Sequence, residues 1–291
     1  MDISLIENQI TIGGLDKYAA IIGKNPSNGA RSPKLWNAAF NEYGLKCSML
    51  PLDVTNDNIL DLLNDLNQDV NFIGGAIAVP YKVVVAKWLN GNITTEARNI
   101  GAVNCLFRDK KGKLKGTNTD GEAALRSYES KYGSVAGKTV LVLGTGGAAK
   151  AVAAYFSAGV GKTGAVSIVG RRNHGIIFSK VLGVRWIDWE EIGQHLTDVD
   201  LIINCTTIGF EKQIKLTPLS IEQIQQLKKS TVEFDIIYQP EITVFQKLAC
   251  ERGVSAMGGL MMNLEQAVIA FNYANYQAND EIVTREAMQK S

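Results

Sequence analysis

The stretch TVLVLGTGGAAKAVAAYFSAG, residues 139–159, decides the fold of the C-terminal half of this chain. It opens on a short apolar run typical of a buried strand, and an alanine-rich helix follows at once. Between the two, Gly144-Thr145-Gly146-Gly147-Ala148-Ala149 fits the pattern G-x-G-x-x-[GA]. In such a loop Gly144 permits a tight turn, and Gly146 lets a pyrophosphate approach the backbone. The stretch therefore predicts a Rossmann-type domain that binds a dinucleotide at residues 144–148, with its phosphates at the helix N-terminus.

The residues after the next predicted strand, AVSIVG at 165–170, favour NADP over NAD. NAD enzymes usually carry an acidic residue at this point, which binds a ribose hydroxyl. Here Arg171 and Arg172 follow the strand, and guanidinium groups suit a 2′-phosphate. NADP is therefore the predicted cofactor, and NAD is the alternative. Both features also have an interpretation without a ligand. The glycine turn would then have a purely steric role, and the two arginines would be solvated.

Strands and helices alternate on both sides of this stretch. Over residues 19–89, short apolar runs alternate with helix-like patterns, which is typical of a mostly parallel α/β sheet. Residues 102–120 contain a polar turn between two short extended runs, which predicts a hairpin. A helix predicted over residues 124–137 joins two domains. We expect an N-terminal α/β substrate-binding domain, residues 1–125, followed by a C-terminal Rossmann NAD(P)-binding domain, residues 126–255, and a return helix within 256–291 that packs on the first domain.

Length, charge and cysteine usage limit the kinds of partner. A chain of 291 residues is long enough for two domains. Its 30 Lys and Arg nearly balance 29 Asp and Glu, so no strong field attracts nucleic acid or a membrane surface. Its four cysteines lie far apart, which indicates reduced thiols without a metal site. No secretory pattern or membrane-spanning run is apparent. We expect a cytoplasmic protein with a small-molecule substrate, either monomeric or homodimeric.

Hydride transfer at an alcohol needs a group that moves the hydroxyl proton. Histidine is the usual choice, but the chain has only His174 and His195. His174 falls in the loop after the two arginines, and His195 in a helix predicted over residues 189–196. Both belong to the cofactor half, and we expect both at the surface. The proton carrier is therefore expected to be another residue.

Seven segments together resemble the shikimate dehydrogenase family, in that family's order and at plausible spacing. Two of them match most closely: GAVN resembles its Ala-x-Asn motif, and GTNTDG its Asn-Thr-Asp motif. The segments are PSNGARSPKLWN (26–37), GGAIAVPYK (74–82), GAVN (101–104), GTNTDG (116–121), NCTTIG (204–209), DIIYQPEIT (235–243) and GGLMMNLEQA (258–267).

The resemblance implies a role for particular residues. Lys82 and Asp120 are implied as the catalytic pair, in which Lys82 carries the proton and Asp120 orients its ammonium group. A nearby carboxylate and partial burial are the means by which proteins tune such a lysine. The implied substrate-binding residues are Ser32, Asn104, Tyr238 and Gln266, and the implied cofactor-binding residues beyond the glycine loop and the two arginines are Thr206 and Gly259.

The chain departs from the family at the substrate's carboxylate end. Three hydroxyl or amide positions of the family's motifs are Ala30, Ala76 and Ala78 here, and a histidine position is Trp36. Each lost hydrogen bond to a charged group weakens binding by about 1.5–3 kcal/mol. The sequence therefore predicts an NADP-dependent dehydrogenase of the shikimate/quinate type whose substrate is altered at that end. Arg31 leaves this open, because a twisted loop would let it clamp the carboxylate.

Two other functions remain in competition. One is an ordinary biosynthetic shikimate dehydrogenase with a tolerant pocket. The other is a dinucleotide-binding sensor without turnover, although a sensor has no need of Lys82 and Asp120 as a proton-transfer pair.

Overall fold

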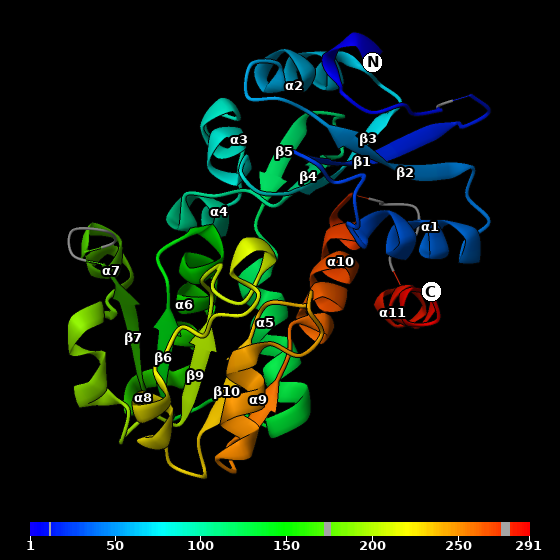
Figure 1. Ribbon diagram of the computed structural model, residues 1–291. Coiled ribbons are helices and arrows are strands. Elements are labelled where there is room, and N and C mark those ends of the chain that lie inside the picture. The colour runs from blue at the N-terminus through cyan, green and yellow to red at the C-terminus, as the bar shows by residue number, and fades with distance from the viewer. Residues whose placement is uncertain (12, 172–175, 275–279) are drawn as a thin grey trace. The chain divides into compact units, whose positions relative to one another are not determined.

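Two β-sheets organise the chain, and Figure 1 shows each with helices packed against it. The computed structural model describes residues 1–291 except 12, 172–175 and 275–279. Its described part divides into a first unit, Met1–Thr119 with Leu264–Ser291, and a second unit, Asp120–Asn263. The chain thus leaves the first unit six residues before the predicted joint at 125 (125 − 119) and returns at residue 264. Independent folding of either unit stays a prediction.

The first unit contains a mixed sheet of order β2-β1-β3-β4-β5. β1 (Lys17–Gly23) pairs in parallel with β2 (Cys47–Asp53) and with β3 (Phe72–Ile77). β4 (Cys105–Arg108) and β5 (Leu114–Thr117) pair antiparallel, which confirms the hairpin predicted over residues 102–120. The parallel strands bring the carboxyl ends of β1, β2 and β3 to one edge, where the family-like segment at 26–37 follows β1 and the segment at 74–82 runs from within β3 past its end.

Helices cover both faces of this sheet and enclose two apolar clusters. α2 shows how the sequence dictates this, because Ile59, Leu62, Leu63 and Leu66 recur at helical spacing and are all buried. α2, α3 and α4 cover one face, and α1, α10 and α11 cover the other. The helix bounds are α1 (Ser32–Glu42), α2 (Ile59–Gln68), α3 (Lys82–Trp88), α4 (Thr95–Ile100), α10 (Leu260–Ala274) and α11 (Glu281–Gln289), with a short 3₁₀ turn η1 (Ile3–Leu5) before β1.

The second unit contains a wholly parallel sheet, of order β11-β10-β9-β6-β7-β8. The chain runs outward from β6 to β8, then crosses to β9 and runs outward to β11. This is the doubly wound Rossmann order, and it confirms the predicted fold class. Its topological switch point lies between β6 and β9. The strand bounds are β6 (Thr139–Leu143), β7 (Ala165–Gly170), β8 (Arg185–Asp188), β9 (Leu201–Asn204), β10 (Val232–Asp235) and β11 (Ser255–Met257).

The helices of the second unit correct two sequence-based expectations. The helix predicted over 124–137 is α5 (Asp120–Tyr132): it begins earlier, with two acidic residues in its first turn, and Gly133 ends it with a φ of +77°. The segment predicted as a helix over 189–196 is a 3₁₀ turn, η3 (Trp189–His195). The other elements are α6 (Gly147–Val160), η2 (Gly161–Thr163), α7 (Ile176–Leu182), η4 (Glu211–Gln213), α8 (Ile221–Gln225) and α9 (Val244–Glu251).

β10 carries two carboxyl groups that are fully buried, Glu233 and Asp235. Asp235 accepts hydrogen bonds from Asn204 Nδ2 (3.1 Å), Thr243 Oγ1 (2.8 Å) and the Ile237 N–H (3.0 Å). Both carboxyl oxygens of Glu233 lack a hydrogen-bond partner among the described residues. Burial raises the pKa of Asp235 to about 6 and the pKa of Glu233 well above its ordinary value. Burial therefore favours the protonated form of Glu233 in the folded protein.

Replacing Glu233 with methionine is expected to stabilise the protein, increasingly so as the pH rises. An unsatisfied buried polar group costs about 1–3 kcal/mol, which methionine removes. The unfolded carboxyl releases its proton above about pH 4.3, whereas the folded one retains it. Stability of the native protein therefore falls with rising pH from that point up through the raised pKa, by up to about 1.4 kcal/mol per pH unit. Urea unfolding at pH 5, 6, 7 and 8 measures the slope.

Glu251→Met, at the exposed end of α9, is the control for the loss of a glutamate. A Glu233→Met protein whose stability falls with pH as steeply as the native one would show that Glu233 does not titrate in this way.

Candidate active site

The turn between β6 and α6 has the form of a phosphate-binding loop. Gly144 has a φ of +110°, and a Cβ atom there would lie 3.1 Å from the Cys205 carbonyl oxygen. Gly146 is the N-cap of α6 without a side-chain cap, and a Cβ atom there would meet nothing within 4 Å. This 14-residue helix thus begins at a residue that has no side chain and leaves open space where one would be. Ala149 is fully buried, as expected for the residue that packs the helix on the sheet. These features fit the diphosphate of a dinucleotide.

The segment after β9 forms the other side of the switch point. Thr206 donates from its N–H (3.1 Å) and its Oγ1 (2.7 Å) to Asn204 Oδ1, and Thr206 Oγ1 accepts from the Ile208 N–H (3.1 Å). The Thr206 hydroxyl is thus engaged in holding its own turn. Its methyl group would lie 3.3 Å from a Cβ atom on Gly144, so Thr206 borders the glycine loop.

The end of β7 also touches the glycine loop. A Cβ atom on Gly170 would lie 2.5 Å from Thr145 Cγ2, so only glycine allows this approach. Arg171 follows directly and is exposed. Arg172 and His174 lie outside the described residues. His195, expected at the surface, is half-buried at the end of η3.

Gly259 joins the start of α10 to the segment after β10. Its N–H donates to the Ile237 carbonyl (3.0 Å), and a Cβ atom there would lie 2.1 Å from the Ile236 carbonyl oxygen. Tyr238 is the next residue of that segment and is half-buried. The backbones of Gly259 and Ile237 therefore lie in contact, and any larger residue at 259 would separate them.

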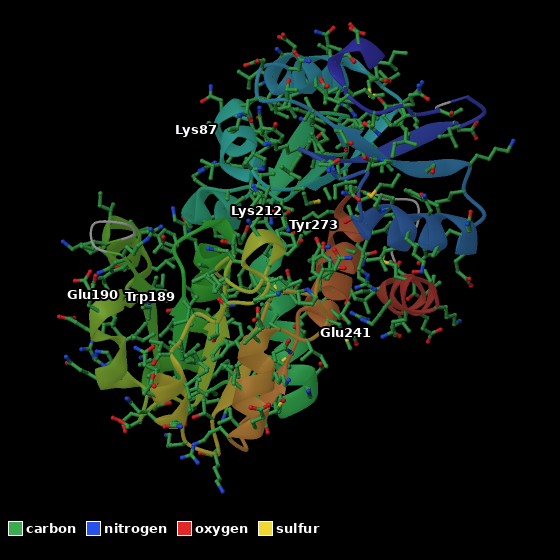
Figure 2. All side chains as sticks on the ribbon, in the orientation of Figure 1. Lys87, Trp189, Glu190, Lys212, Glu241 and Tyr273 are labelled. Atoms are coloured by element: carbon green, nitrogen blue, oxygen red, sulfur yellow. The ribbon has the colours of Figure 1, made fainter. Side chains whose placement is uncertain are left out.

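In the first unit, Lys82 is the first residue of α3 and is half-buried. Tyr81, just before it, is buried and donates from its hydroxyl to the Val54 carbonyl (2.7 Å), which fixes the entry to the helix. The Lys82 carbonyl accepts from the Val103 N–H (2.9 Å). Lys87, labelled in Figure 2, lies on the same helix and is exposed.

Asn104, Thr119 and Gln266 form a connected group next to this point. Asn104 Nδ2 donates to Thr119 Oγ1 (3.0 Å), and Asn104 Oδ1 accepts from the Thr119 N–H (2.8 Å). Thr119 Oγ1 also donates to the Gln266 backbone carbonyl oxygen (3.3 Å). Asn104 and Thr119 are buried, and Gln266 is half-buried. The structure thus links Lys82, Asn104 and Gln266 through Val103 and Thr119.

Asp120 follows Thr119 directly and is the first residue of α5. It is buried, and its carboxylate at a helix N-terminus is favoured by the helix dipole. Asp120 is the first residue of the second unit.

The four altered positions lie in an apolar cluster of the first unit. Trp36 is fully buried, with its ring 5.2 Å from that of Phe271, and Ala76 is 7% exposed. Ala30 and Ala78 are partly buried and pack against the same cluster. Arg31 is half-buried and is the N-cap of α1, directly before the buried Ser32. This part of the first unit therefore offers methyl groups and rings where the family's motifs offer donors.

Sequence analysis missed Asp53, which holds the loop before α1. The Asp53 carboxylate is buried at the end of β2 and accepts from the Ser27 N–H (2.8 Å) and from the Ser27 hydroxyl. The Asp53 N–H donates to Asn8 Oδ1 (2.8 Å). The only sign of this role in the sequence is an acidic residue at the end of a predicted strand. The contact itself is not apparent there, because Ser27 and Asp53 are 26 residues apart.

Among the residues that the structure describes, no group of three or more His, Cys, Asp or Glu side chains could hold a metal ion. No helix in the described ranges is long and apolar enough to cross a membrane.

Comparison with known proteins identifies the family. The family model described as the shikimate dehydrogenase substrate binding domain matches residues 21–106. The shikimate dehydrogenase (NADP(+)) of Microcystis aeruginosa is 32% identical over 96% of this chain and 98% of its own length. The chain belongs to the shikimate dehydrogenase family. Shikimate dehydrogenases are oxidoreductases, and this family member is classed with them.

Solved structures agree with this assignment. A shikimate dehydrogenase crystallised with NADP+ is 28% identical to this family member, with a TM-score of 0.82 over 94% of this chain and 95% of the other. A 5-ketofructose reductase of a Gluconobacter species, solved without ligand, is 27% identical, with a TM-score of 0.78 over 96% and 99%. The fold thus occurs in enzymes named for different substrates.

Proposed function

We propose that this chain transfers a hydride between NADP(H) and a ring ketone or hydroxyl of a shikimate- or quinate-like substrate that is altered at the carboxylate end. One contrast within the first unit carries the proposal. Asn104, Thr119 and the Gln266 backbone carbonyl are joined by hydrogen bonds, whereas positions 30, 76 and 78 are alanines in an apolar cluster.

NADP is the proposed cofactor, because the loop geometry fits a dinucleotide and the relatives are NADP+-dependent. When bound, its nicotinamide ring accepts or donates the hydride. Gly144, Gly146, Gly147 and Ala148 would receive the diphosphate at the N-terminus of α6. Arg171 and Arg172 would bind the 2′-phosphate, and Thr206 and Gly259 would border the cofactor at the other strand ends.

Lys82 and Asp120 are proposed as the catalytic pair. Lys82 would move the proton at the reacting hydroxyl, and Asp120 would orient its ammonium group. Asn104 is held in place by its two hydrogen bonds with Thr119, and an amide side chain suits a ring hydroxyl. Gln266, Ser32 and Tyr238 complete the proposed substrate-binding set. A purely dinucleotide-binding sensor would need none of these groups, which counts against that alternative.

The apolar cluster around Ala30, Ala76 and Ala78 argues against a substrate carboxylate at the place where the family's motifs supply donors. A charged group that is removed from water without donors is strongly disfavoured. Each lost hydrogen bond costs about 1.5–3 kcal/mol, which is tenfold or more in affinity. The 5-ketofructose reductase, named for a keto sugar without a carboxylate, supports a substrate of that kind for this chain. Arg31, directly before Ser32, favours the second candidate, an ordinary biosynthetic shikimate dehydrogenase.

An NADPH oxidation assay with a panel of ketones tests the proposal. We expect a ketone without a carboxylate, with 5-ketofructose as the first probe, to give a kcat/KM at least about tenfold above that of 3-dehydroshikimate, the ratio that one lost charged hydrogen bond would produce. A preference for 3-dehydroshikimate would establish the ordinary biosynthetic activity instead. Binding of NADPH without turnover of any ketone would favour the sensor. Cytoplasmic localisation and a monomeric or homodimeric state stay predictions.

A further inference from the structure

We propose that Lys150 is a second cation for the 2′-phosphate of NADP, acting together with Arg171. The inference rests on the proposed cofactor and deepens it, because it names a residue that distinguishes NADP from NAD. It starts from a lysine in an unfavourable place. Lys150 is the fourth residue of α6, and its N–H donates to the Gly146 carbonyl (3.0 Å) at the helix N-cap.

A cation in the first turn of a helix opposes the helix dipole. The first turn of α6 contains no acidic residue that would offset it. No carboxylate among the described residues forms an ion pair with Lys150. The helix N-terminus and the lysine therefore add their positive charges at one end of α6, an arrangement that a bound anion would neutralise.

The direction of the Lys150 side chain separates it from the diphosphate. Lys150 Nζ lies 5.1 Å from the centroid of the Phe178 ring, on α7. α7 begins at Ile176, five residues after Arg171. The ammonium group is thus held to the side of α6 that faces Phe178 of α7. In a Rossmann domain the adenosine ribose lies at the end of this strand.

The end of β7 brings Arg171 to the same region. β7 is the parallel neighbour of β6, so Arg171 and the glycine loop emerge at one edge of the sheet. Gly170, next to Arg171, approaches Thr145 of the glycine loop so closely that no Cβ atom fits. Gly170, just before Arg171, therefore lies against Thr145, which is five residues before Lys150 in the chain.

The two cations suit a phosphate in complementary ways. The Arg171 guanidinium is exposed and can bind two oxygens at once, whereas the Lys150 ammonium acts as a point charge. Phe178 packs on the lysine and restrains it, so less freedom is lost when the anion binds. NAD has a neutral hydroxyl in place of this phosphate, so the contribution of Lys150 should be confined to NADP.

Calorimetric titration of Lys150→Met with NADP+, NAD+, 2′,5′-ADP and AMP tests the inference. Methionine keeps an apolar stem against Phe178 and removes the charge. We expect the Kd for NADP+ and for 2′,5′-ADP to rise about tenfold, as for one lost charged contact, while the Kd for NAD+ and AMP changes less than about twofold. Lys150→Arg should retain NADP+ binding. Lys162→Met, in the exposed turn η2 that follows the C-terminal end of α6, is the matched control and should change none of the four.

Thermal unfolding confirms that each variant is folded before titration. Equal losses for NADP+ and NAD+ would overturn the inference, because Lys150 would then act on the diphosphate or on the fold. Unchanged NADP+ binding by Lys150→Met would overturn it as well. Native protein that binds 2′,5′-ADP no better than AMP would overturn the proposed cofactor itself, which is a different result.

Discussion

Replacing Lys82 with alanine is expected to lower the turnover of the ketone substrate by roughly 10²–10⁴, the usual size of a general acid/base contribution. NADPH affinity should stay unchanged, because the proposed cofactor residues all lie in the second unit. The backbone of Lys82 is fixed by Tyr81 and by the Val103 N–H, and neither bond involves the lysine side chain. The loss should therefore reflect the missing proton carrier. Single-turnover kinetics at saturating NADPH measure it.

Lys87→Ala is the matched control for this experiment. Lys87 lies on α3 as well but is exposed, and no role is proposed for it. A chemical step close to the native rate in Lys82→Ala would remove Lys82 from the mechanism. A large loss in Lys87→Ala would instead indicate damage to α3.

The features that sequence predicted best are those set by local chemistry. Gly144 and Gly146 lie in one turn whose backbone demands glycine or leaves room for a ligand, so their positions follow from a few neighbouring residues. The hairpin of β4 and β5 was likewise signalled by the polar turn between them. The crossing from β8 back to β9 is a property of the whole sheet, and the sequence indicated it only indirectly, through the Rossmann-type glycine loop and the family-like segments.

The features that sequence missed depend on residues far apart in the chain. Thr119 holds Asn104 and contacts Gln266, 147 residues away. The bond between Ser27 and Asp53 joins two segments that look unrelated as sequence. Glu233 reads as an ordinary glutamate until the sheet places strands on both sides of it and buries it. In each case tertiary packing decides the role, which local patterns do not contain.

The surroundings of Ala30, Ala76 and Ala78 could not be predicted from the sequence, and their place in a substrate pocket stays a prediction. The sequence predicted that Ala30, Ala76 and Ala78 line a pocket that has lost its donors. The structure adds that they pack with Trp36 and Phe271 into a continuous apolar cluster. Trp36 thus belongs to the same replacement of polar by apolar groups. Its ring fills space in this cluster that a smaller, polar histidine would leave open.

Restoring the donors together, as Ala30→Ser with Ala76→Asn and Ala78→Thr, is expected to raise kcat/KM for shikimate by one or more orders of magnitude. The gain should appear mainly as a lower KM, because a carboxylate remote from the reacting hydroxyl is bound equally well in the ground and transition states. The single changes should do little, since a half-satisfied polar group in an apolar cluster is no better than an apolar one. Steady-state oxidation of shikimate by the native protein, the three single variants and the triple variant measures this.

The same variant should be less stable than the native protein when no substrate is present. Each buried polar group without a partner costs about 1–3 kcal/mol. Ala78 Cβ lies 2.9 Å from where a Cβ atom on Gly23 would be, so the space beside position 78 depends on that glycine. Shikimate should therefore raise the melting temperature of the triple variant more than that of the native protein, because the carboxylate supplies the missing partners.

If the native protein already oxidises shikimate with a micromolar KM, another group must hold the carboxylate. Arg31, at the N-cap of α1 beside Ser32, is then the first residue to replace.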